Sequence, residues 1–241
     1  MKETSTIIYG RIPVITCLKA QRRKVFKLYI QEGVKLPELH QFISVVPTEY
    51  KQKSFLDKIT KSGVHQGIVA EVENLFVWRF DEWYRTKANM VEDIVILDHI
   101  EDPRNFGAII RSAVAFDLDS ILFTREGSAP LTPITVKASA GAVEYATLVE
   151  IHSTPRVLRR LKEIGFKVVA LDKDGEVTIN GVKWHEKNIL IIGSEGKGIR
   201  PVVKNFADLV VAIPTSKDIS QLNASVSAGI AFYVMKNHKV K

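Results

Sequence analysis

The sequence predicts an α/β protein in which a parallel sheet with helices on both faces is preceded by a smaller α/β domain. Three observations lead to this fold class. From Asp93 onward, short and nearly continuous apolar strands alternate with helical stretches, which is typical of a parallel sheet covered on both faces. The first third of the chain lacks this alternation. It also holds nearly all of the net charge of +7, since residues 1–90 contain 15 Lys and Arg against 9 Asp and Glu.

Residues 1–78 are expected to form a small mixed α/β domain, followed by a linker at 79–92. The predicted elements are a helix at Pro13–Gln21, a strand at Phe26–Ile30, a strand at Ile43–Val46, a helix at Tyr50–Lys61 and a strand at Gly67–Glu73. Arg79–Met90 is polar and charged without a clear period, which favours a linker. A basic cluster comprises Lys19, Arg22, Arg23, Lys24 and Lys27. Such a domain-wide bias favours a polyanion as partner.

Residues 93–241 are expected to form the second domain. Strands are predicted at Ile94–Leu97, Ile121–Phe123, Lys167–Leu171, Ile189–Ile192 and Leu209–Ile213, and helices at Ala108–Phe116, Pro155–Ile164 and Leu222–Met235. Open parallel sheets bind ligands in the loops at the carboxyl ends of their strands. The loops after the first, fourth and fifth strands are therefore the expected site.

Composition excludes several classes of protein. No apolar run is long enough to span a bilayer, and the N-terminus does not resemble a signal peptide. The single cysteine, Cys17, cannot form an internal disulfide and is expected to be a buried small hydrophobe. No group of residues has metal-ligand spacing, so no metal site is predicted. A reducing, cytoplasmic location is the corresponding expectation.

Asn105, Gly107 and Arg111 follow the first strand of the second domain. Pro103 stiffens the loop, and Gly107 lets the backbone approach a partner closely as a helix begins. Asn105 can donate and accept hydrogen bonds, which suits holding a ligand and a backbone group together. Arg111, one turn into the expected helix, should project back toward the loop. Alone, this spacing indicates only a helix cap with a surface arginine.

A glycine-rich turn follows the strand that ends at Ile192. Gly193, Gly196 and Gly198 surround one acid, Glu195, which indicates backbone pressed against a flat ligand with the acid held near it. The spacing is neither that of a P-loop nor that of a dinucleotide-binding turn.

A third segment, also after a strand, runs from Ile213-Pro214 to Leu222-Asn223-Ala224-Ser225 and leads into a helix rich in small residues. In this order, the three segments resemble the motifs of the SpoU/TrmH branch of the SPOUT methyltransferases. These enzymes methylate ribose 2′-hydroxyls of RNA with S-adenosylmethionine. The similarity extends through the C-terminal half, including Lys137–Ala142.

The N-terminal third is similar to the L30e-like substrate-binding domain of RlmB-type 23S ribosomal RNA guanosine methyltransferases. The signs are Tyr9-Gly10-Arg11 and the segment from Ser62 to Gly67. His65, within that segment, is expected to be a hydrogen-bonded structural residue.

The resemblance implies 2′-O-methylation of RNA, most of all of a guanosine in large-subunit ribosomal RNA. It also implies a C-terminal trefoil knot and a homodimer joined through the knotted domain. The catalytic and substrate-positioning set carried over is Asn105, Arg111, Glu195 and Asn223, and the residues expected to contact S-adenosylmethionine are Gly193, Ile213 and Leu222. Because arginine stays charged, Arg111 is interpreted as an electrostatic stabiliser and phosphate clamp.

The third segment departs from the family pattern. Thr215, Lys217 and Gln221 stand where the family has Met, Gly and a functional serine, so the role of that serine is not carried over. Two alternatives stay open. One is a transfer-RNA methyltransferase, against which the L30e-like N-terminus argues. The other is a non-catalytic RNA-binding or ribosome-assembly protein, which Gln221 would suit. Neither DNA nor a membrane is an expected partner.

Overall fold

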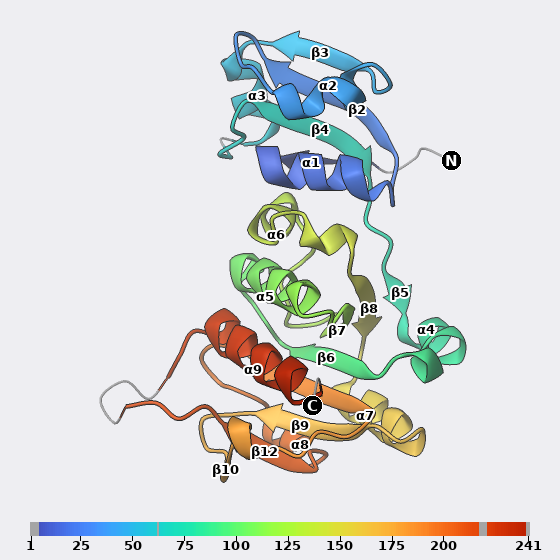
Figure 1. Ribbon diagram of the computed structural model, residues 1–241, viewed down its shortest axis with the longest axis vertical. Helices are drawn as coiled ribbons and strands as arrows, with labels where there is room; N and C mark the ends of the chain where they lie inside the picture. The colour runs from blue at the N-terminus through green and yellow to red at the C-terminus, as the bar shows by residue number, and fades with distance from the viewer. Residues whose placement is uncertain (1–4, 62, 217–220, 240–241) are drawn as a thin grey trace.

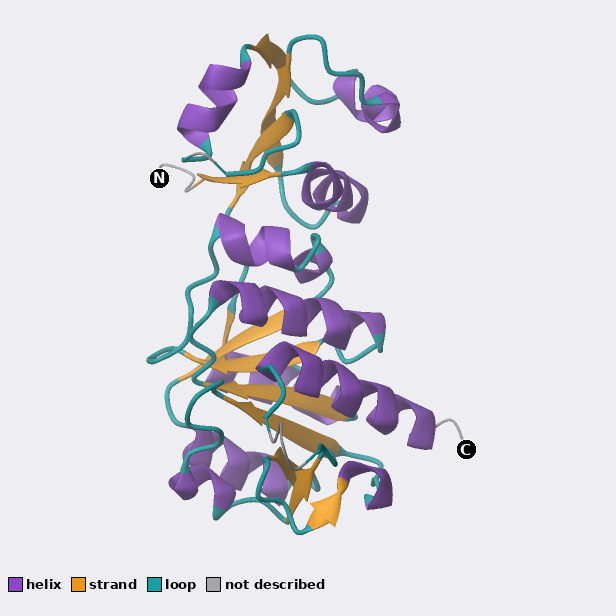
Figure 2. Cartoon of the chain, turned by 90° about the vertical axis from the view of Figure 1, so that its left-hand side faces the viewer, coloured by secondary structure: helices purple, strands orange, loops and turns teal. Residues whose placement is uncertain are grey.

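The computed structural model describes residues 5–61, 63–216 and 221–239. Ser62 and Lys217, which the motif comparison used, lie outside the described residues. A small and a large sheet lie towards opposite ends of the long axis, and helix α6 (Pro133–Ala138) lies between them (Figure 1). The large sheet has helices on both faces (Figure 2).

The N-terminal unit is a mixed four-stranded sheet with helices around it. Its elements are β1 (Ser5–Tyr9), α1 (Arg11–Ala20), β2 (Val25–Gln31), a 3-10 helix (Pro37–Leu39), α2 (His40–Ile43), β3 (Thr48–Lys51), α3 (Lys53–Ile59) and β4 (Ile68–Glu73). The strand order is β1-β4-β2-β3, in which β2 and β3 are parallel and the other pairs antiparallel. The predictions of α1, β2 and β4 are confirmed, whereas β1 was not predicted.

The strand predicted at Ile43–Val46 is wrong. Ile43 ends α2, and the amides of Val45 and Val46 both donate to the carbonyl of Phe42, as in a helix C-terminus. Ile43 and Val46 still pack against the core, whereas Val45 is 74% exposed. The strand at the edge of the sheet is instead β3. Because β3 continues to Lys51, helix α3 begins at Lys53 and not at Tyr50 as predicted.

The C-terminal part is an eight-stranded sheet in which every pair is parallel, as predicted. Its strands are β5 (Trp78–Arg79), β6 (Asp93–Asp98), β7 (Ser120–Thr124), β8 (Thr147–Ile151), β9 (Lys167–Leu171), β10 (Val177–Thr178), β11 (Asn188–Gly193) and β12 (Leu209–Ala212). They lie in the order β10-β12-β9-β11-β6-β7-β8-β5. Besides α6, the helices are α4 (Phe80–Thr86), α5 (Pro103–Ala115), α7 (Thr154–Glu163), α8 (Pro201–Lys204) and α9 (Ala224–Lys239), with 3-10 helices at Ala88–Met90, Ala142–Glu144 and Ile179–Gly181. Within the described ranges, no helix is long and apolar enough to cross a membrane.

Alternate residues of the central strands enter two separate cores. On β6, Val95 and Leu97 pack with α5 and α9, whereas Ile94 and Ile96 pack with α4 and α7. All four side chains are fully buried. Strands buried on both faces explain why the sequence shows continuous apolar runs rather than an alternation.

The segment expected as a linker has regular structure. It begins with Arg79 of β5, which pairs in parallel with β8, and continues as α4. Trp83 of α4 is fully buried among the apolar side chains on one face of the large sheet. The connection between the two parts is therefore packed onto the sheet.

The two parts meet at a buried ion pair. The guanidinium of Arg23 bonds the carboxylate of Glu144 at 2.5 Å, and the two side chains are only 4% and 1% exposed. Arg23 also donates to the carbonyl of Glu73, at 2.9 Å. Cys17 lies beside this pair and is buried, as predicted. Burial, as the larger cause, and the negative charge of Glu144 raise the pKa of its thiol to about 12. Arg23 is thus an internal residue rather than part of a basic surface.

A second contact between the parts involves Lys137 of α6. Its Nζ donates to the carbonyl of Val64 and lies 5.1 Å from the ring centroid of Tyr9. Burial lowers the pKa of this amine. The neighbouring His65 is buried, with its Nδ1 accepting from the amide of Gly67 and its Nε2 bonded to Asp57. The structural role predicted for His65 is confirmed.

Candidate active site

Three loops meet at the carboxyl edge of the large sheet. They follow β6, β11 and β12 and carry the three sequence motifs. The last residues of β11 and β6, Gly193 and Asp98, are direct partners in the parallel register. Residues 95 positions apart in the chain are therefore neighbours in space.

Helix α5 begins at Pro103, five residues before the predicted start at Ala108. The side chain of Asp102 caps it by accepting from the amide of Arg104 at 2.8 Å, and proline suits the first helical position. Asn105 consequently lies in the first turn. Arg111 is the ninth residue of the helix rather than one turn in, and its side chain is exposed.

The loop after β11 is a tight turn that only glycine permits at its base. A Cβ on Gly193 would lie 2.3 Å from the carbonyl carbon of Gly198. The amide of Gly198 donates to the carbonyl of Ser194 at 3.0 Å, which closes the turn. Glu195 lies in this turn, as the sequence predicted.

Asn223 caps helix α9. Its Oδ1 accepts from the amide of Ser225 at 2.9 Å and from its hydroxyl at 2.6 Å. The exposed amides at a helix N-terminus bind an acceptor, so they fix the direction of the Asn223 amide group. Its Nδ2 must then point away from the helix.

A directed chain of hydrogen bonds follows from that cap. Nδ2 of Asn223 donates to Oδ1 of Asn105 at 3.1 Å, and Nδ2 of Asn105 donates to Oε1 of Glu195 at 2.5 Å. Each amide is oriented by its predecessor, and the chain ends on a carboxylate. The structure thus brings together three of the four predicted catalytic residues. Arg111 contacts none of them among the hydrogen bonds and ion pairs of the described residues.

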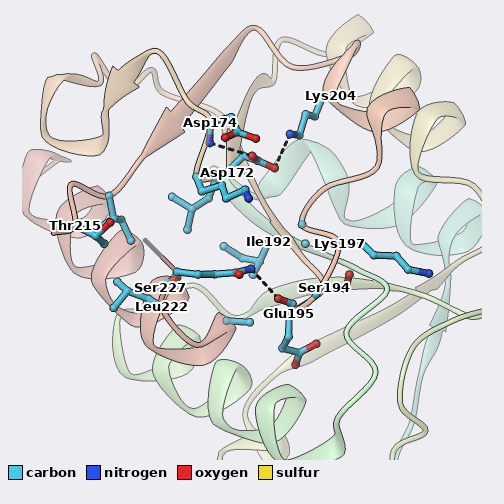
Figure 3. Close-up of a pocket in the computed structure, with 18 residues that line it drawn as sticks. Asp172, Asp174, Ile192, Ser194, Glu195, Lys197, Lys204, Thr215, Leu222 and Ser227 are labelled. Carbon is cyan, nitrogen blue, oxygen red and sulfur yellow. Dashed lines mark hydrogen bonds and ion pairs between the residues drawn. The ribbon is translucent and has the colours of Figure 1, made fainter. Parts of the chain in front are cut away.

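A pocket lies beside this chain, between the loops after β9, β11 and β12 (Figure 3). It is lined by Leu171, Asp172, Lys173, Asp174, Ile192, Gly193, Ser194, Glu195, Gly196, Lys197, Gly198, Lys204, Ile213, Thr215, Gln221, Leu222, Ala224 and Ser227. All three residues predicted to contact the cofactor, Gly193, Ile213 and Leu222, are among them. The pocket is lined by both polar and apolar groups, and the apolar side chains of Ile192, Ile213 and Leu222 together with the open backbone of Gly196, where a Cβ would meet nothing within 4 Å, fit a flat heteroaromatic ligand.

Asp172 is a pocket residue that the sequence analysis did not single out. Its side chain is 4% exposed and pairs with Lys204 at 2.7 Å. Burial opposes its charge, but this ion pair and bonds from the amides of Asp174 and Ile199 lower its pKa overall. Its position directly after the strand at 167–171 was the available signal, since that strand ends at the same edge of the sheet.

A second buried carboxylate anchors the loop after β11. Arg200 donates to both carboxylate oxygens of Asp98, at 3.0 and 2.7 Å, and the hydroxyl of Thr154 donates to the same group at 2.8 Å. The bonds to Asp98 raise the pKa of Arg200. The described residues contain no group of three or more His, Cys, Asp or Glu arranged to hold a metal ion.

Two family models match this chain and together cover most of both of its parts. Residues 92–233 match the SpoU rRNA methylase family, and residues 7–78 match the family described as RNA 2′-O ribose methyltransferase substrate binding. YacO of Bacillus subtilis, assigned to the TrmH family of tRNA/rRNA methyltransferases, is 31% identical over 240 residues. The match covers 97% of this chain and 96% of YacO.

Solved structures share the fold. The SpoU methyltransferase AviRb of Streptomyces viridochromogenes, in complex with the cofactor AdoMet, superposes with a TM-score of 0.81 at 21% identity and covers 98% of this chain and 91% of its own. The Aquifex aeolicus TrmH/SpoU tRNA-modifying enzyme has a TM-score of 0.56 at 23% identity. That match covers 67% of this chain and 84% of the enzyme.

Proposed function

Since the chain belongs to the SpoU rRNA methylase family of tRNA/rRNA methyltransferases, we propose that it methylates a ribose 2′-hydroxyl of RNA with S-adenosylmethionine, the cofactor of that family. The observation that carries this proposal is the meeting of Asn105, Glu195 and Asn223 beside the pocket after β11. That pocket combines apolar side chains and open backbone with polar groups, which suits an adenosine group. Gly193, Ile213 and Leu222 would hold it.

The chemistry needs a hydroxyl oxygen that attacks as it loses its proton. S-adenosylmethionine would supply the methyl group of its sulfonium and would leave as the neutral thioether S-adenosylhomocysteine. One oxygen of Glu195 is held by Asn105, which leaves Oε2 to accept a hydrogen bond from the incoming hydroxyl. The asparagines keep the carboxylate turned toward the substrate. This arrangement positions the nucleophile before the reaction, which lowers its entropic barrier.

Arg111 is proposed to bind an RNA phosphate. Helix α5 contains two arginines and no acidic residue, and Arg104 and Arg111, seven residues apart, lie on the same exposed face. Neither side chain has a hydrogen bond or ion pair to any residue that the structure describes. A cation in the first helical turn opposes the helix dipole, so Arg104 is placed at some cost to stability. Both features suit a polyanionic substrate.

Replacing Arg111 with lysine is expected to lower kcat/KM about 10- to 100-fold, because lysine keeps the charge but cannot bind a phosphate through two parallel bonds. Steady-state methyl transfer to RNA measures this. Arg85→Lys, an exposed arginine on α4, serves as the matched control and should behave as wild type. Near-normal turnover of the Arg111 variant would remove this residue from the mechanism.

The proposed substrate is a guanosine in large-subunit ribosomal RNA. The match of residues 7–78 to a substrate-binding family supports an appended RNA-recognition unit, which we infer to be L30e-like. The tRNA-modifying structure covers 67% of this chain, whereas the structure of an rRNA methyltransferase from Sinorhizobium meliloti covers 97% of it, which favours ribosomal over transfer RNA. We also infer a trefoil knot at the loops before α9 and a cytoplasmic location.

Transfer of labelled methyl to separated, unmodified large-subunit, small-subunit and transfer RNAs tests the proposal. The expected result is label in alkali-stable dinucleotides of large-subunit RNA. Label in transfer RNA alone would change the substrate and keep the chemistry. No label anywhere, together with no cofactor binding by calorimetry, would reject the proposal in favour of an RNA-binding protein.

A homodimer is proposed from the surface of α9. Val226, Ile230 and Tyr233 form one apolar stripe and are 49%, 36% and 59% exposed. A second copy would cover it. Tyr233→Asp is expected to convert a dimer into a monomer in sedimentation experiments, whereas Tyr50→Asp, at an exposed tyrosine of the N-terminal unit, should not. A monomeric wild-type protein would contradict the dimer.

A further inference from the structure

Gln221 bridges two loops of the pocket. Its Nε2 donates to the main-chain carbonyl of Glu195 at 2.9 Å. Both residues line the pocket, from opposite loops, and Figure 3 marks this bond at Glu195 with a dashed line. The loop that carries Gln221 also carries Asn223, which reaches Asn105. The same short segment therefore touches both other motifs.

The turn around Glu195 needs such a contact. Glycine loses more conformational freedom on ordering than any other residue, and Gly196 follows Glu195 directly. Gly196 is exposed, and a Cβ added there would meet nothing within 4 Å, so no atom packs at that position. Its other end is fixed by Asp172, whose carboxylate accepts from the amide of Ile199. The tip at Glu195 depends on hydrogen bonds.

Glu195 is held at two points. Asn105 binds its carboxylate and Gln221 binds its main chain. A single contact would leave the residue free to turn about the other, whereas two contacts fix both its position and its direction. A serine in place of Gln221 could not do this, because its hydroxyl lies on Cβ and is too short to cross between the loops.

We propose that Gln221 is a positioning residue that fixes the main chain at Glu195, and so holds the carboxylate at the reacting ribose and closes one wall of the cofactor pocket. This inference rests on the function proposed above. Gln221 stands where the family pattern has a serine, and its longer side chain has a different role, which is to link two loops. Gln221 itself does not need to exchange a proton.

The test uses three variants of the full-length protein. Gln221→Ser shortens the side chain, Gln221→Glu keeps its shape but removes the donor, and Gln221→Lys keeps both reach and an N–H donor. Amide hydrogen exchange at residues 194–198, without cofactor, reports the loop directly. Calorimetry gives the dissociation constant for S-adenosylmethionine, and methyl transfer gives kcat and KM for RNA.

Loss of one hydrogen bond predicts about a two- to tenfold change in each affected quantity. For the serine and glutamate variants we expect faster exchange confined to this loop, weaker cofactor binding and lower kcat, with an unchanged KM for RNA. The lysine variant should recover loop protection. Gln41→Ser, at an exposed glutamine of α2, is the matched control and should change nothing.

Unchanged exchange and cofactor binding in Gln221→Ser would overturn the proposal, as would a serine variant that is faster than wild type. The exchange measurement does not depend on the reaction. If wild-type protein methylates no RNA, the proposed function fails while exchange still decides whether Gln221 holds the loop.

Discussion

Replacing Arg23 with alanine is expected to lower the free energy of unfolding by about 3–5 kcal/mol, because it leaves the carboxylate of Glu144 buried without a partner. The bonds that would be lost join the guanidinium to Glu144 and to the carbonyl of Glu73. Urea denaturation measures the effect through a lower midpoint. Few single changes in this chain should cost as much, since both side chains are almost completely buried.

Arg22→Ala is the matched control, since the neighbouring arginine is exposed and should contribute no more than about 0.5 kcal/mol. Arg23→Leu combined with Glu144→Leu should recover much of the loss, because it removes both charges together. A destabilisation by Arg23→Ala of less than about 1 kcal/mol would mean that water reaches Glu144 and that the two parts are joined more loosely.

Replacing Gly193 with alanine should abolish methyl transfer and weaken cofactor binding by more than about a hundredfold, since the turn cannot keep its shape. The added Cβ would lie 2.3 Å from the carbonyl carbon of Gly198 and 2.5 Å from the amide nitrogen of Ile199. Both are main-chain atoms and cannot rotate away. Calorimetric titration with S-adenosylmethionine and the unfolding midpoint measure the two consequences.

Gly196→Ala, in the same turn, separates the effect of the clash from that of the added methyl group. It should keep the wild-type unfolding midpoint, because the new Cβ meets no atom within 4 Å. If Gly193→Ala bound the cofactor normally, the close approach of the main chain at Gly193 and Gly198 would not be needed for the pocket.

The parallel sheet could be predicted because its apolar strands are a local signal. Strands of two residues, such as β5 and β10, carry no such pattern and exist only through pairing with a neighbour. The start of α5 was misplaced because Pro103 was interpreted as a loop residue. Asp102 and Pro103 together are a capping residue followed by proline at the first helical position, which predicts the observed start.

The members of the candidate site could be predicted from motifs, but their geometry could not. Asn105 and Glu195 are far apart in the chain, and the direction of each amide depends on a helix cap in a third segment. From the sequence alone, Arg23 looks like one member of a basic cluster, because the burial of a single arginine depends on contacts between distant segments. The sequence shows only that Gln221 stands at a position where the family has serine. Its hydrogen bond to Glu195 could not be predicted, because it depends on how the two loops are placed in space.

The contacts of Arg23 and Lys137 between the two parts hold the N-terminal unit at a fixed distance from the candidate site. A recognition unit on a slack tether would accept a target at any reach within the tether's length. Here the distance between the N-terminal unit and Glu195 is a constant of the fold. In the proposed function, an RNA is a substrate only if its folded form places one ribose at that fixed distance from the RNA element that the N-terminal unit binds. The protein therefore selects the shape of the RNA together with its sequence.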